Sequence, residues 1–120
     1  MSQIKNSEVE FIEGQEGTRI KQYFQPQNTS NGINYSIAQF TLEAGKKSKK
    51  HKLRSSEIYY ILEGHGRLTI SSKTYDLEKD DAIYVPADSE QFIENTGAKN
   101  LKFLCIVDPA WKLEDEIILE

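Results

Sequence analysis

The sequence predicts an all-β fold, a sandwich or a barrel, from three features of its 120 residues. Short segments alternate apolar and polar residues with a period of two, and they are rich in β-branched and aromatic side chains. Turn-forming residues separate these segments at close spacing. No apolar pattern of helical period extends beyond about two turns, except at 111–119. Many short strands at such spacing are typical of sandwiches and barrels.

The first predicted strand is the alternating segment EVEFIEG at 8–14, within an N-terminal region of looser pattern. The segment SIAQFTL at 36–42 places Ala38, Phe40 and Leu42 on one face, as expected for a strand with one buried side. Further strands are predicted at 57–63, 67–71, 74–77, 82–85, 91–95 and 101–107. Turn signals separate them at Gly45, GHG 64–66, SSK 71–73, EKDD 78–81, PADS 86–89 and NTG 95–97.

Composition limits the function classes. The net charge of -4 argues against a general nucleic-acid-binding protein, and no apolar run approaches the length of a membrane span. The single cysteine, Cys105, fits a reducing cytoplasm, and the first residues contain no apolar export signal. We therefore expect one cytoplasmic domain over residues 1–120 that binds neither nucleic acid nor membrane.

The charged residues are unevenly distributed. Six of the 15 lysines and arginines lie between Lys46 and Arg54, and four acids lie in the last eight residues. The basic run has three readings. It protects a strand edge, it attracts an anionic small molecule, or it binds nucleic acid, against which the lack of aromatic residues between the lysines argues. Alternation places Lys47 and Lys49 on the side of His51, towards the interior. The acidic tail is expected to dock through Ile117, Ile118 and Leu119.

Two motifs stand in order in the middle of the chain. The first is Gly45-x5-His51-x-Leu53-x3-Glu57-x6-Gly64, in which His51 precedes a predicted strand. The second is Asp80-x5-Pro86-x-Asp88-x2-Gln91-x3-Asn95. They resemble the two motifs of the cupin superfamily, in particular its small single-domain members. The resemblance covers 45–64 and 80–95 and implies an antiparallel jelly-roll β-barrel with a pocket between its sheets.

The resemblance also implies where a metal would lie. In metal-binding cupins two His and a Glu of the first motif and a His of the second hold the ion, and these positions are His51, Leu53, Glu57 and Gln91 here. Leucine cannot ligate a metal, and glutamine offers only a neutral amide oxygen. The remaining set of His51, Glu57 and Gln91 suits Mn²⁺, Fe²⁺ or Mg²⁺ as the candidate cofactor. The alternative is a buried hydrogen-bonded pair of His51 and Glu57 without an ion.

The pocket remains even if the metal is absent. Strand parity places Lys49, His51, Leu53, Glu57, Tyr59, Gln91 and Ile93 around it. Apolar walls with a few polar groups are typical of small-molecule sites. His51 and Glu57 are also the candidate catalytic residues, with Glu57 orienting the imidazole of a general acid or base. His65 in a glycine turn, Cys105 within a strand and Trp111 are given structural roles.

Three functions follow from these observations. The first is binding of a small, anionic molecule in the pocket with weak or no metal binding. The second is a metal-dependent enzyme, either a dioxygenase or an isomerase of sugar phosphates or keto acids, as the resemblance allows. The third is a structural module whose pocket is vestigial. A homodimer is also expected, because single-domain cupins pair through N-terminal strands and 8–14 is such a segment.

Overall fold

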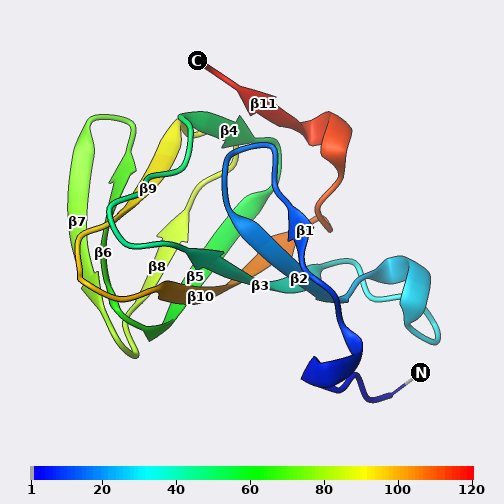
Figure 1. Ribbon diagram of the computed structural model, residues 1–120. Helices are drawn as coiled ribbons and strands as arrows, with labels where there is room; N and C mark the ends of the chain where they lie inside the picture. Colours follow the sequence, from blue (N-terminus) through cyan, green and yellow to red (C-terminus); the bar gives the residue numbers. More distant parts are fainter. Residues whose placement is uncertain (1) are drawn as a thin grey trace.

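The structure, a computed structural model, describes residues 2–120 and contains two antiparallel β-sheets that face each other (Figure 1). The larger sheet contains, in spatial order, β1 (Ile12–Glu13), β2 (Arg19–Phe24), β3 (Ser36–Leu42), β10 (Leu101–Asp108), β5 (Ser56–Glu63) and β8 (Ala82–Val85). The smaller sheet contains β11 (Glu116–Ile118), β4 (His51–Leu53), β9 (Gln91–Asn95), β6 (His65–Ile70) and β7 (Lys73–Glu78). Short 3-10 turns lie at Asn6–Glu8, Pro26–Asn28 and Leu113–Asp115. The prediction of an all-β fold is confirmed.

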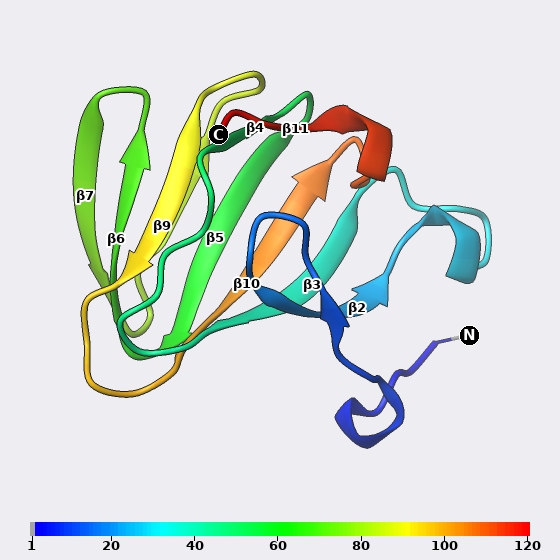
Figure 2. The same cartoon turned by 45° about the horizontal axis from the view of Figure 1, so that its top comes forward.

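The chain passes repeatedly from one sheet to the other. Strand β3 belongs to the larger sheet, β4 to the smaller and β5 again to the larger, and β8, β9 and β10 alternate in the same way. Figure 2 shows the two layers with the strands of each running side by side. This exchange between two antiparallel sheets is the jelly-roll arrangement.

The core lies between the sheets because each strand turns alternate side chains inward. In β5, Tyr59 and Ile61 are buried while Ile58 and Tyr60 are exposed. The ring of Phe103 stacks on Phe40 at 5.3 Å and on Tyr59 at 5.2 Å between centroids. These aromatic contacts hold the Tyr59 ring in place against the interior.

The turns of the second motif keep their shape without glycine. Asp80 and Asp88 occupy positions where the cupin pattern has glycine, and they adopt φ of 72° and 64°. Aspartate tolerates this left-handed region better than most residues. By contrast, a side chain at Gly64 would lie 2.7 Å from the Asn100 carbonyl oxygen, so this position of the first motif requires glycine.

One local expectation is wrong, and two strands were not predicted. Residues 111–119 form no α-helix but only the 3-10 turn Leu113–Asp115 followed by β11. In β11 and just after it, Ile117 and Leu119 are exposed while Ile118 between them is more covered, which is the period of a strand. His51 precedes the strand that carries Glu57, as expected, but it also lies on a short strand of its own, β4, where it pairs with Gln91 on one side and Ile118 on the other. Strand β2 was not predicted, and it pairs with β1 and β3.

Within residues 2–120 no helix has the length and apolar character needed to cross a membrane.

Candidate functional site

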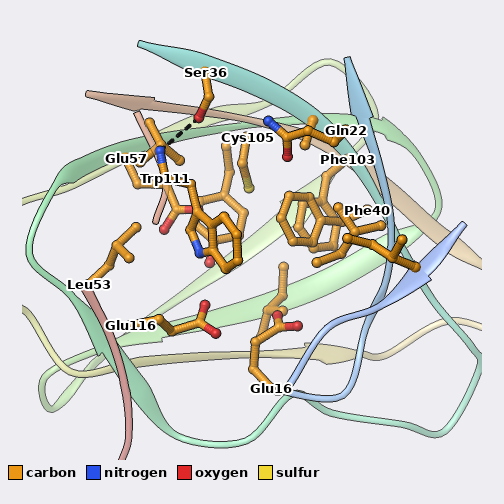
Figure 3. Close-up of a pocket in the computed structure, with 16 residues that line it drawn as sticks. Glu16, Gln22, Ser36, Phe40, Leu53, Glu57, Phe103, Cys105, Trp111 and Glu116 are labelled. Carbon is orange, nitrogen blue, oxygen red and sulfur yellow. Dashed lines mark hydrogen bonds between the residues drawn. The ribbon is translucent and has the colours of Figure 1, made fainter. Parts of the chain in front are cut away.

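A cavity lies between the two sheets, where the β1–β2 region and the C-terminal segment both contribute to its lining. Strands β2, β3, β5 and β10 form most of its wall, with Leu53 of β4 and Ile93 of β9 opposite. Glu16 comes from the β1–β2 turn, and Trp111 and Glu116 come from the C-terminal segment (Figure 3). The free space inside is about 30 Å³, room for about two water molecules. We call this space the inter-sheet cavity.

One wall of the inter-sheet cavity carries a chain of hydrogen bonds centred on Gln91. The Tyr59 hydroxyl donates to Gln91 Oε1, and Gln91 Nε2 donates to Glu57 Oε1 at 3.1 Å. The Cys105 thiol lies near the Glu57 carboxyl group. All these side chains are buried, so their polar groups satisfy one another away from water.

His51 is bonded to the backbone and not to Glu57. Its Nδ1 lies 2.7 Å from the Lys49 carbonyl oxygen. A carbonyl can only accept, so Nδ1 carries a hydrogen and Nε2 is the nitrogen left to act. For Nε2 the part of the chain that the structure describes offers no hydrogen-bond partner. The expected hydrogen-bonded pair of His51 and Glu57 is therefore wrong, because each of the two side chains uses a different partner.

Two carboxyl groups from outside the motifs complete the site. Glu16 is 5% exposed and accepts from Thr18 Oγ1 at 2.6 Å and Thr18 N at 3.3 Å. Glu116, from β11, lines the same cavity, and Figure 3 shows the two carboxyl groups on its lower side. Sequence reasoning missed both, because they lie far from the motifs and only the three-dimensional packing of both chain ends brings them to the cavity.

Burial sets the acidities of this site. It raises the pKa of Glu57 above 4.5, and the side chains of Cys105 and Gln91 offset the effect only in part. Burial likewise raises the pKa of Glu16; Thr18 and His51 oppose this rise, and Glu116 adds to it. The pKa values of the Tyr59 hydroxyl and the Cys105 thiol are raised well above their ordinary values, also chiefly by burial. Burial and the raised pKa of the Cys105 thiol disfavour the thiolate form that a nucleophilic cysteine needs.

The raised pKa of Glu16 predicts a pH effect on stability. A group whose pKa is higher in the folded state contributes stability below its unfolded pKa, near 4.5, and this contribution is lost as pH rises through the folded-state value. We expect Glu16→Gln, which cannot ionise, to show a flatter stability profile above pH 4.5 and to gain on wild type as pH rises. Urea unfolding at several pH values measures this. Glu10→Gln, at an exposed position, is the control, and parallel Glu16→Gln and wild-type profiles would contradict the prediction.

The structure separates the predicted pocket residues into those that line the cavity, those beside it and one outside it. Leu53, Glu57, Tyr59 and Ile93 line the inter-sheet cavity. His51 and Gln91 are buried beside it, close enough for His51 to act on Glu57 through its charge. The residue outside the cavity is Lys49.

Lys49 is exposed and does not line the cavity, so its expected inward direction is wrong. The reason is that residues 48–50 are not a regular strand, and alternation cannot be counted back from His51 through them. Ser48 is the buried residue there, and its hydroxyl accepts a hydrogen bond from the Ile93 backbone. Lys47 is likewise exposed.

The residues present do not fit a metal ion. Gln91 Oε1, the predicted third ligand, already accepts from Tyr59, and the amide nitrogen faces Glu57. Leu53 fills the position of the missing imidazole with a buried apolar side chain. In residues 2–120 no group of three or more His, Cys, Asp or Glu side chains is arranged to hold a metal. The hydrogen bonds of Gln91 to Tyr59 and Glu57 therefore occupy the groups that would have to bind the metal.

Comparison with known proteins identifies relatives of this chain. Residues 38–107 match the Cupin domain family. "Uncharacterized protein MJ1618" of Methanocaldococcus jannaschii is 39% identical over 106 residues, which are 88% of this chain and 84% of that protein. Mannose-1-phosphate guanylyltransferase RfbM of Salmonella typhimurium is 27% identical over 92% of this chain, but this chain spans only 25% of the transferase.

Solved structures give the same result. Oxalate decarboxylase of Bacillus subtilis superposes with a TM-score of 0.80 at 26% identity, over 94% of this chain and 31% of that one. A variant of Streptomyces PAC13, solved with uridine, has a TM-score of 0.80 at 18% identity over 100% of this chain and 92% of its own, which shows the shared fold alone. With both motifs, the two facing sheets and a family match over more than half of its length, the chain belongs to the Cupin domain family.

Proposed function

We propose that this protein binds a small molecule in the inter-sheet cavity through its own side chains, without a metal ion. The observation that carries the proposal is the hydrogen-bond chain of Tyr59, Gln91 and Glu57. In this chain the predicted metal ligands Gln91 and Glu57 bond to protein side chains, and the cavity beside them has mostly apolar walls. A cavity with apolar walls and a few directed polar groups is the usual form of a small-molecule site.

The comparisons support small-molecule binding at the level of the family. Bacillus subtilis oxalate decarboxylase has Mn(II) centres, and the Salmonella relative is a mannose-1-phosphate guanylyltransferase. This chain spans about a quarter of the transferase and a third of the decarboxylase, so the activities of those whole proteins are not carried over. Cupins host many chemistries, and the choice must come from this site.

The expectation of an anionic ligand loses its structural support. It depended on Lys47 or Lys49 at the mouth of the pocket, and both are exposed outside the lining. The ionisable residues that do line the cavity are acids, namely Glu16, Glu57 and Glu116 together with Tyr59 and Cys105. Lys49→Ala is now expected to leave ligand binding unchanged, and it becomes a control.

The single tryptophan provides the test of this proposal. Trp111 is the only tryptophan in the sequence and lines the inter-sheet cavity, so its fluorescence reports on occupancy. We expect a screen of small metabolites to yield compounds that shift both its emission and the melting temperature in a saturable way. Ala38→Phe, which fills the cavity from β3, should abolish both effects. If no compound acts on wild type, the pocket is vestigial and the structural-module reading replaces the proposal.

The homodimer stays a prediction. Strand β1 pairs with β2 of its own chain, and Phe11 beside it is 38% exposed, with the Arg19 and Lys21 cations over its ring. Light scattering should give about twice the chain mass of 13.8 kDa. Phe11→Asp should shift the mass towards the monomer, whereas Leu113→Asp, at another exposed apolar position, should not. A monomeric wild type at micromolar concentration would refute the dimer.

A further inference from the structure

The inter-sheet cavity is lined by a buried and a half-buried carboxyl group, and no lysine or arginine of the described residues lines it. Glu16 and Glu116 line it from two different segments, and the proximity of Glu116 disfavours ionisation of Glu16. The ion pairs found within residues 2–120 involve other acids, namely Glu90, Asp76 and Glu63. A buried carboxylate is costly unless a cation or hydrogen-bond donors compensate it. Thr18 supplies donors to Glu16, but no lysine or arginine lines the cavity within the described part of the chain.

A second observation, independent of the acids, points to a missing ligand. Gln22 of β2 lines the same cavity, and its Nε2 is buried with no hydrogen-bond partner among residues 2–120. Buried amide donors are nearly always satisfied, so the Gln22 amide needs an acceptor from outside the protein, which is either a water molecule or an acceptor atom of a ligand. His51 is buried near Glu16 and Glu57, and its Nδ1 is the nitrogen bonded to the Lys49 carbonyl oxygen.

The remaining walls are apolar and aromatic. Trp111 lies in the middle of the lining, with Glu116 and Glu16 below it and the rings of Phe40 and Phe103 beside it (Figure 3). An aromatic face attracts a cation through its negative quadrupole, and an indole does so more strongly than other rings. Two carboxyl groups next to an indole therefore form a setting for an ammonium group.

We infer that the inter-sheet cavity takes a small organic amine, with its ammonium group between Glu16, Glu116 and Trp111 and a hydrogen-bond acceptor towards Gln22. The inference rests on the proposed small-molecule function and gives that ligand its chemical class. The free space of about 30 Å³ is too small for such a molecule. Binding therefore requires the C-terminal segment, which carries Trp111 and Glu116, to move outward.

The segment is held in a way that permits this movement. Strand β11 has three residues and lies at the edge of the smaller sheet, where it pairs with β4 alone. Beyond it, the Leu119 N–H donates to the Lys50 carbonyl oxygen at 2.9 Å, and the Lys50 N–H donates to Glu120 Oε2 at 2.6 Å. A short edge strand can separate without disturbing the core.

Matched compounds that differ only in charge test the inference. Tyramine, tyrosol and 4-hydroxyphenylacetate share a phenol and a two-carbon side chain, and their side-chain ends are cationic, neutral and anionic. Ethanolamine, ethylene glycol and glycolate form a smaller set of the same kind. We expect the amine of at least one set to raise the melting temperature and to change Trp111 fluorescence saturably, and its neutral and acidic counterparts to do neither.

The carboxyl groups are tested by paired variants. Glu16→Gln with Glu116→Gln should weaken the bound amine about 10- to 100-fold, as expected for loss of charge-assisted contacts. The exposed pair Glu10→Gln with Glu114→Gln removes the same charge and should leave affinity unchanged. If the double variant is unstable, Glu116→Gln alone, at a half-buried position, serves in its place with at least a severalfold loss.

The outcomes separate this inference from the function on which it rests. If acidic or neutral compounds bind and amines do not, the amine class is wrong and small-molecule binding stands. Unchanged amine affinity in the Gln variants would also overturn the inference. If neither these sets nor the wider metabolite screen affects Trp111 or the melting temperature, the proposed function itself fails.

Discussion

Gln91→Leu is expected to lower the free energy of unfolding by about 2–5 kcal/mol, because it leaves two buried polar groups without partners. The Tyr59 hydroxyl loses its acceptor, and Glu57 Oε1 loses the amide that donates at 3.1 Å. Leucine has a similar size, so lost packing contributes little. Denaturant unfolding of the variant and wild type measures the difference.

The same substitution on the outer side of the sheet is the control. Gln39 is half-buried on β3, where its neighbours Ala38 and Phe40 face the cavity, and the described residues show no hydrogen bond from its side chain. Gln39→Leu should therefore change stability by less than about 0.5 kcal/mol. Equal effects of the two substitutions would mean that the Gln91 hydrogen bonds contribute nothing to stability.

A double-mutant cycle isolates the bond between Tyr59 and Gln91. Tyr59→Phe removes only the hydroxyl, and its cost in wild type includes an unpaired Gln91 oxygen. In the Gln91→Leu background that oxygen is absent, so Tyr59→Phe should cost less or become favourable. A coupling energy of about 1 kcal/mol or more is expected for neighbours in one network. Strictly additive effects would contradict the hydrogen-bond chain.

The sequence predicted the fold well because the signals were local. Alternation in segments such as 57–63 and 101–107, together with turn residues between them, depends on neighbours only a few positions apart. Glu57 and Tyr59 both line the cavity, since they lie on one strand whose alternation is unbroken. Predictions failed where this regularity stops, as at Lys49 in the irregular stretch before β4.

The chemistry of the site was much less accessible from sequence. Glu16 and Glu116 are 100 positions apart, and nothing near either residue marks it as part of a cavity. His51 bonds to the backbone carbonyl of Lys49, and Glu57 bonds to the side-chain amide of Gln91 on the opposite sheet. The spacing of the motifs cannot reveal either partner. Only the alternation of RIKQYF at 19–24 could have placed Gln22 beside the cavity.

Restoring the two missing imidazoles should convert the site into a metal centre. We expect Leu53→His with Gln91→His to bind Mn²⁺ roughly 100-fold or more tightly than wild type, since even loss of supporting contacts around a metal costs about 10–100-fold. Leu53 lies two residues beyond His51 on β4, so both side chains point to the same face, and both are buried. Removal of the Gln91 amide also frees the Glu57 carboxylate to ligate.

His51 is already oriented for this role. The hydrogen bond from its Nδ1–H to the Lys49 carbonyl fixes the ring and leaves Nε2 for a metal. Most metal-bound histidines make such a hydrogen bond with the nitrogen that does not bind the metal. Calorimetric titration with Mn²⁺ and the electron paramagnetic resonance spectrum of the bound ion measure the outcome. Leu53→His or Gln91→His alone should gain less, and adding Glu57→Gln to the double variant should remove most of the gain. Micromolar or tighter binding by wild type would instead show that this protein recruits a ligand outside the four positions, and would favour the metal-dependent enzyme over the metal-free binding site.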